Sequence, residues 1–93
     1  MGKVLVRLRI LPTDVGIGSK DVLNSIQKIL PSGMEIRRAV DEPIAFGLVA
    51  SIVDITVEER GGEMDKLEES LRSSELVSQV EVMAVSRLST RIG

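Results

Sequence analysis

Histidine and cysteine are both missing from this chain of 93 residues. Without them the protein cannot form disulfides, thiolate nucleophiles, histidine bases or zinc sites with cysteine or histidine ligands. Tryptophan and tyrosine are also missing, and Phe46 is the single aromatic residue. The core must therefore be built from aliphatic side chains and methionine, and the place of Phe46 needs a separate reason.

Two further absences limit the choice of partners. No stretch of the sequence approaches the roughly 18 continuous apolar residues of a membrane-spanning helix. The 12 basic residues are outnumbered by 14 acidic ones, which gives a net charge of -2. A general binder of nucleic acid or of membrane surfaces usually carries a marked basic excess. We therefore expect no direct contact with nucleic acid and no membrane association.

The length and composition of the chain predict one soluble domain. A chain of this length is enough for one domain and not for two, and 43% of its residues are apolar. Its first residues lead directly into a strand pattern, with no signal peptide before it. The sequence predicts a cytoplasmic protein with a single domain over residues 1–88 and a short flexible tail over residues 89–93.

Hydrophobic periodicity predicts the secondary structure. Alternating apolar residues indicate strands, and apolar residues at helical spacing indicate two helices. Ser19 is a candidate N-cap for the first helix, which Pro31 and Gly33 end. Along residues 48–57, apolar side chains occur on both of the alternating faces that a strand would have, which is typical of a central strand. The expected elements are strands at 4–10, 34–40, 48–57 and 80–84, with helices at 20–30 and 63–71.

The order strand–helix–strand–strand–helix–strand amounts to two βαβ units in tandem. It predicts an α+β fold, the ferredoxin-like split βαβ sandwich. The expected sheet is four-stranded and antiparallel, with strand order 4-1-3-2 and both helices on one face. Because this fold hosts unrelated functions, it does not decide what the protein does.

The segment from Asp41 to Ala50 is the most informative part of the chain. Pro43 fixes its own φ angle and restricts Glu42, so the sequence predicts a stiff turn here. Gly47 permits backbone angles that are closed to other residues. The local sequence alone favours Phe46 as a core residue that caps the end of the sheet. The alternative is that the turn presents Phe46 as a recognition tip.

The sequence contains no recognisable active site. An RNA-recognition module needs aromatic residues on its central strands, and a metal chaperone of this fold needs a cysteine pair. The glycine-containing loop at 16–20 suggests an anion site of the acylphosphatase kind, but a flexible loop that ends in a helix cap explains it more simply. The acidic residues around the second helix are more simply a solvated face than a magnesium site. We expect no catalytic residue, no metal and no cofactor.

One run closely resembles a signature of the translation elongation factor 1-beta family: Glu42-Pro43-Ile44-Ala45-Phe46-Gly47-Leu48. The opening strand, the acidic second helix and the closing segment at 80–88 are also similar to this family, so the resemblance covers almost the whole chain. Members are guanine-nucleotide exchange factors of the GTPase elongation factor 1-alpha. The resemblance implies that this chain binds the GDP-loaded GTPase and promotes replacement of GDP by GTP. Its short form looks like the archaeal members.

The resemblance also implies which residues touch the GTPase. Pro43, Phe46 and Gly47 belong to one contact region, in which Phe46 is an aromatic anchor. Arg87 and Leu88 match a basic residue and a leucine that reach towards the partner's magnesium site, where a cation competes electrostatically with the metal. Such a factor makes and breaks no covalent bond, so we do not expect an enzyme.

Two features depart from the family pattern. The family usually has lysine at the position of Arg87, and the planar fork of arginine prefers bidentate contacts with a carboxylate or phosphate. Residues 89–93 extend past Leu88, where the family often ends. The cation that disturbs the magnesium site is therefore either Arg87 or Arg91, and both stay open.

The predicted topology separates the two contact regions. In a sheet of order 4-1-3-2, strands three and four run in the same direction. Phe46 precedes strand three and Arg87 follows strand four, so they lie at opposite ends, roughly 25–30 Å apart. A partner that touches both ends must be large, and we expect this chain to be a monomer when free. The alternative function is a small-ligand-binding regulatory module of the same fold.

Overall fold

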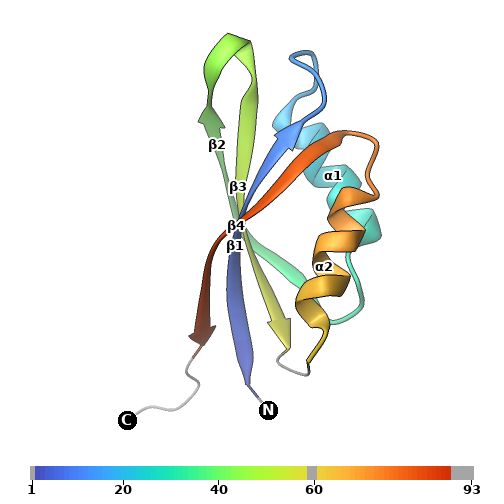
Figure 1. Cartoon of the computed structure of the whole chain (residues 1–93), viewed down its shortest axis with the longest axis vertical. Coiled ribbons are helices and arrows are strands. Elements are labelled where there is room, and N and C mark those ends of the chain that lie inside the picture. The colour runs from blue at the N-terminus through green and yellow to red at the C-terminus, as the bar shows by residue number, and fades with distance from the viewer. Residues whose placement is uncertain (1, 59–60, 89–93) are drawn as a thin grey trace.

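A computed structural model describes residues 2–58 and 61–88 of the chain. Figure 1 shows one twisted sheet with two helices on one of its faces. Strands and helices follow one another in the predicted order. The elements are β1 (Lys3–Pro12), α1 (Ser19–Ile29), β2 (Glu35–Pro43), a short 3-10 helix η1 (Ala45–Gly47), β3 (Val49–Glu58), α2 (Glu63–Arg72) and β4 (Val77–Leu88).

The sheet is antiparallel throughout and has the strand order β2-β3-β1-β4. Read from the other edge, this is the predicted order 4-1-3-2, so the ferredoxin-like α+β fold is confirmed. β1 pairs with β3 on one side and with β4 on the other. Since β3 and β4 both run against β1, they run in the same direction.

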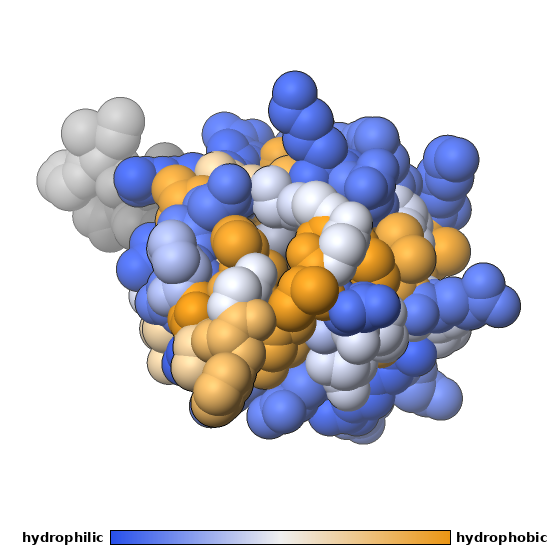
Figure 2. Space-filling view, turned by 90° about the horizontal axis from the view of Figure 1, so that it is seen from above, coloured by the Kyte–Doolittle hydropathy of each residue, from blue (hydrophilic) through white to orange (hydrophobic). Residues whose placement is uncertain are grey.

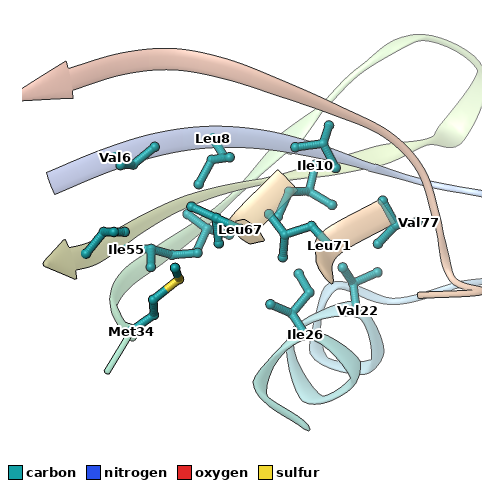
Figure 3. Packing of buried hydrophobic residues seen from close by; sticks show 13 residues of the cluster. Val6, Leu8, Ile10, Val22, Ile26, Met34, Ile55, Leu67, Leu71 and Val77 are labelled. Carbon is teal, nitrogen blue, oxygen red and sulfur yellow. The ribbon is translucent and has the colours of Figure 1, made fainter. Parts of the chain in front are cut away.

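The core lies between the sheet and the helices, as Figure 3 shows. Each helix contributes two buried side chains that are four residues apart and therefore lie on one face of that helix. All the members of the cluster are aliphatic residues or methionine, as the scarcity of aromatic residues requires. The buried cluster consists of Val6, Leu8, Ile10, Val22, Ile26, Met34, Val53, Ile55, Val57, Leu67, Leu71, Val77 and Val80.

β3 is buried on both of its faces, which agrees with its predicted central position. Ile55 lies opposite Val6 on the face that the helices cover. Its neighbour Asp54 lies opposite Arg7 on the other, open face and is buried there as well. The alternation along β3 therefore separates an aliphatic core from a charged open face.

The prediction that Ser19 is the N-cap of α1 is wrong by one residue. Gly18 is the N-cap, and its carbonyl oxygen accepts hydrogen bonds from the N–H groups of Asp21 (3.1 Å) and Val22 (3.2 Å). Ser19 is the first helical residue, and no side chain caps this end of the helix. Glycine is an acceptable N-cap because it leaves the first amides accessible to water.

The prediction of a turn at Glu42-Pro43 is also wrong. β2 continues through Pro43, which pairs with Val49 at the end of the ladder. β2 is an edge strand, and a proline at its end has no ladder hydrogen bond to donate. The turn follows at residues 44–48, with the restricted backbone of Pro43 at its base.

β4 is longer than the predicted strand at 80–84. It pairs with β1 along the whole length of that strand, which extends it to Leu88. The register shifts between Arg7 and Leu8, and such a bulge bends the strand that carries the extra residue. In Figure 1, β4 ends on the side away from α2. The predicted tail at 89–93, including Arg91, lies outside the described residues.

Candidate partner-binding site

The connection between β2 and β3 forms one end of the molecule, at the top of Figure 1. The N–H of Ile44 donates to the carbonyl oxygen of Leu48 (2.8 Å), and the N–H of Leu48 donates to the carbonyl oxygen of Ala45 (3.3 Å). The turn is thus closed by hydrogen bonds of its own backbone. These bonds restrain the backbone of residues 44–48.

Phe46 has left-handed backbone angles, with φ 63° and ψ 30°. Within residues 2–58 and 61–88 it is the only residue other than glycine with a positive φ. Gly47 follows with φ 79°, the geometry that a glycine permits. For a residue with a Cβ atom the left-handed conformation costs about 1–2 kcal/mol. Strain of this kind concentrates at functional positions, where the surrounding structure enforces it.

The side chain of Phe46 is 93% exposed. The prediction from local sequence that Phe46 is a core residue is therefore wrong. The left-handed turn places it at the tip of the hairpin, beyond Pro43 and Val49, which are the last paired residues of β2 and β3. The geometry supports the alternative, in which the turn presents Phe46 as a recognition tip.

The loop between β1 and α1 lies beside this hairpin. A Cβ atom built on Gly47 would meet Cγ1 of Val15 at 3.8 Å, and Val15 is itself exposed. Figure 2 looks down on this end of the molecule and shows apolar side chains gathered in one patch. Val15 cannot be identified as a contact residue from the sequence, because no local pattern reveals that two loops distant in sequence meet.

Arg87 lies at the other end of the sheet, on the last part of β4. Its side chain is exposed. Its backbone lies opposite Val4, so Arg87 shares a face with the core residue Val6. Val85, opposite Val6, is 53% exposed, which shows that the helices leave this part of β4 uncovered. Leu88 is the last residue of β4.

The predicted contact residues therefore form two groups at opposite ends of the sheet. Val49 marks the hairpin end of β3, and Val57 is level with Arg87 because both pair with Val4. The strand from Val49 to Val57 spans about 26 Å at 3.3 Å per residue. The structure keeps Phe46 and Arg87 apart, as the predicted topology requires.

Between the two ends, the open face of the sheet carries an ion pair that joins its central strands. Arg7 donates from Nε to Oδ1 of Asp54 (2.8 Å) and from Nη2 to Oδ2 (3.1 Å). These hydrogen bonds, and the positive charges of Arg7 and Arg38, lower the pKa of Asp54, although burial of the carboxyl group opposes the shift. The same pair raises the pKa of Arg7.

Arg9 makes a wider contact across the same face. Its Nε atom is 3.0 Å from Oε1 of Glu42 on β2, and its Nη1 atom is 3.7 Å from Oε1 of Glu81 on β4. Nε of Arg9 and Oε1 of Glu42 are buried but not aligned for a hydrogen bond, and neither has another such partner in the described part of the chain. The contact is an ion pair that holds β2 just before Pro43.

The anion site and the magnesium site, which the sequence made less favoured than a capped loop and a solvated face, gain no support from the structure. The carboxylate of Asp21 lies 3.8 Å from the Cβ position of Gly18, so a negative group already stands at the start of α1 and would repel an anion. Among residues 2–58 and 61–88, no group of three or more acidic side chains is arranged to hold a metal ion. The charged groups described above pair with one another across strands, which is a structural arrangement.

The structure is thus a ferredoxin-like domain with an exposed aromatic residue at one end of its sheet and an exposed arginine at the other. Comparison with known families identifies it further. The family model of the EF-1 guanine nucleotide exchange domain matches residues 5–88. The chain belongs to this family.

Curated relatives match along nearly their whole length. The elongation factor 1-beta of Staphylothermus marinus is 46% identical over 89 residues, which is 95% of this chain and 99% of the relative. That of Hyperthermus butylicus is 42% identical over 90 residues, or 96% and 98% of the two chains. That of Methanothermobacter thermautotrophicus is 38% identical over 88 residues, or 95% and 99%. These relatives are archaeal, which confirms the predicted type.

A solved structure supports the fold alone. The ACT domain from the GTP pyrophosphokinase of Chlorobium tepidum superposes with a TM-score of 0.60 at 22% identity, and the match covers 87% of this chain and 99% of that one. In the described residues, no helix has both the length and the apolar composition needed to cross a membrane.

Proposed function

We propose that this chain promotes the exchange of GDP for GTP on elongation factor 1-alpha during protein synthesis. The observation that carries the proposal is Phe46, an aromatic side chain that is 93% exposed on a strained backbone at the tip of a closed turn. The backbone that carries this side chain is already ordered, so little backbone freedom is lost on binding, which favours an anchoring role. Membership of the EF-1 exchange-domain family supports the choice of partner.

The hairpin end supplies affinity in this proposal. Phe46 enters an apolar depression on the GTPase. Pro43 at the end of β2 and Gly47 with its positive φ fix the turn that presents the ring. Because the backbone of the turn is already ordered before binding, the entropic cost of forming this contact is small.

The other end acts on the nucleotide site. Arg87 approaches the magnesium and phosphate contacts of the bound GDP, and its positive charge weakens the hold of the GTPase on the metal. The planar guanidinium also suits a bidentate contact with a carboxylate of the GTPase. Leu88 follows it at the end of β4 and contacts the GTPase beside it. GDP then leaves, and GTP replaces it.

Several properties follow from this role. The chain makes and breaks no covalent bond, so it is not an enzyme in the chemical sense and uses no cofactor or metal of its own. Residues 1–88 form the exchange domain. Its partner is the GDP-bound GTPase, not nucleic acid or a membrane. It is a monomer when free and acts in the cytoplasm, where proteins are made.

The test is the release of a fluorescent GDP analogue from elongation factor 1-alpha of the same organism. Substoichiometric amounts of this chain are expected to accelerate release in the presence of excess GTP. If the GTPase is shown to be active and GDP-loaded and release is not accelerated, the proposal fails. The better hypothesis is then a small-ligand-binding regulatory module, which thermal stabilisation of the chain by a metabolite would support.

A further inference from the structure

The loop at residues 13–18 is ordered, although the sequence gives it no regular structure. The N–H of Thr13 donates to the carbonyl oxygen of Leu76 (3.0 Å), and the N–H of Ile17 donates to the carbonyl oxygen of Asp14 (3.3 Å). The N–H of Val15 donates to Oδ1 of Asp14 (2.7 Å). Ile17 packs against the core. The loop is therefore fixed at both of its ends, and Val15 is held between them.

Val15 is 58% exposed on this fixed loop. Its Cγ1 atom lies 3.8 Å from the position that a Cβ atom of Gly47 would take, so Val15 lies beside the turn that carries Phe46. Two loops that are separate in sequence thus each present an exposed apolar side chain, Val15 and Phe46, at the end of the molecule that Figure 2 shows. A contiguous apolar patch on an ordered surface marks an interaction site.

We propose that Val15 and Phe46 form one contact surface, the two-loop surface, and that the GTPase covers both side chains with a single apolar depression. This inference rests on the proposed function and adds a second loop to the contact. Phe46 is the anchor, and Val15, beside the turn that carries Phe46, keeps water from the edge of the contact.

The shape of the two-loop surface favours a folded protein as its occupant. Small molecules bind in concave sites that bury most of their surface. Phe46 and Val15 instead project outward, with exposed fractions of 93% and 58%. Exposed apolar side chains of this kind fit a depression on a larger molecule, and Val15 lies beside the turn that the proposed function already assigns to the GTPase.

The experiment compares Val15→Asp with Val40→Asp in the GDP-release assay, at increasing concentrations of each variant. Val40 is a matched control, because it is also an exposed valine (42%) but lies on the open face of the sheet, opposite Ile52. Val15→Asp is expected to raise the apparent KM about tenfold with little change in kcat, since a carboxylate would be desolvated against an apolar surface. Val40→Asp is expected to leave both constants unchanged.

A second substitution of Val15 and a double variant complete the experiment. Threonine has nearly the shape of valine, so Val15→Thr is used if thermal unfolding shows that Val15→Asp disrupts the loop. Val15→Thr is expected to raise the apparent KM about twofold to threefold. In a Phe46→Ala background the effect of Val15→Asp should shrink, because the two residues share one contact. If both Val15 variants behave like Val40→Asp, the two-loop surface is contradicted while the exchange function stands. If the unchanged chain does not accelerate GDP release, the function fails first.

Discussion

The two ends of the sheet are built differently, although both carry proposed contact residues. At the hairpin end, the backbone closes on itself, Phe46 is strained and a second ordered loop lies beside it. At the other end, Arg87 lies on an edge strand, beyond a bulge and clear of the helices. A rigid apolar group suits affinity, whereas a charge at a strand end suits an electrostatic effect on the bound nucleotide. The following predictions test this division.

Loss of the cation is expected to have the largest effect. Arg87→Ala should lower the maximal rate of GDP release by about 100-fold with little change in KM, the scale seen when one group that acts on charge in a reaction centre is removed. Arg87→Lys should keep most of the activity, because it keeps the charge. Stopped-flow measurements over a range of concentrations separate the two constants. Full activity of Arg87→Ala, with slow exchange by Arg91→Ala, would transfer the role to Arg91.

Loss of the aromatic anchor is expected to change KM and not kcat, the reverse of the effect expected for Arg87→Ala. Phe46→Ala should raise the apparent KM about 30-fold, which corresponds to about 2 kcal/mol for a buried aromatic anchor, and should leave kcat nearly unchanged. Phe46→Leu should lie between the two, because it keeps apolar volume without the ring. A fall in kcat at constant KM would show that Phe46 acts on the nucleotide site instead.

The strain at Phe46 predicts that stability and function oppose each other there. Phe46→Gly should stabilise the free domain by about 0.5–1 kcal/mol, because glycine adopts a positive φ without the clash of a Cβ atom. Chemical denaturation measures this, and exchange should be as weak as for Phe46→Ala. The matched control is Ala45→Gly, which should destabilise slightly, because Ala45 has no positive φ to relieve. Destabilisation by both substitutions would argue against strain at Phe46.

The Arg7–Asp54 ion pair, which lies between the two ends, predicts a small pH dependence of the folding stability that is confined to acidic pH. The lowered pKa of Asp54 means that its carboxylate stabilises the folded state above the ordinary aspartate pKa of about 3.9. This contribution is lost as the pH falls through that value towards the lower pKa of the folded state. Urea denaturation of Asp54→Asn should therefore show less loss of stability on acidification than the unchanged chain. Its exchange activity at neutral pH should be retained, since Asp54 lies at neither end.

Periodic patterns predicted the elements and their order well. Alternation in β1 and spacing of four residues in the helices reflect which side chains the core buries, and that information is local. The doubly apolar pattern of β3 identified a central strand for the same reason. Once the order was known, the strand directions placed Phe46 and Arg87 at opposite ends without any knowledge of side-chain contacts.

The errors occurred where long-range pairing decides. β2 includes Pro43 because Val49 pairs with it, and β4 reaches Leu88 because β1 continues alongside. Neither fact is written in the local sequence. Phe46 was expected in the core because aromatic residues usually are buried, but the left-handed backbone of two successive residues places it at the tip of the turn. Val15 escaped notice because only the folded chain brings it to Gly47.

If the two ends act independently on one GTPase, their effects must multiply. The most direct measurement is kcat/KM for GDP release from elongation factor 1-alpha with the unchanged chain, Arg87→Ala, Phe46→Ala and the double variant. We expect the unchanged chain to accelerate release and the double variant to show the product of the two single reductions. The two residues lie at opposite ends of a sheet whose strand from Val49 to Val57 spans about 26 Å, and substitutions that far apart behave additively in free energy. No acceleration by the unchanged chain, or a double variant no slower than the slower single one, would contradict this.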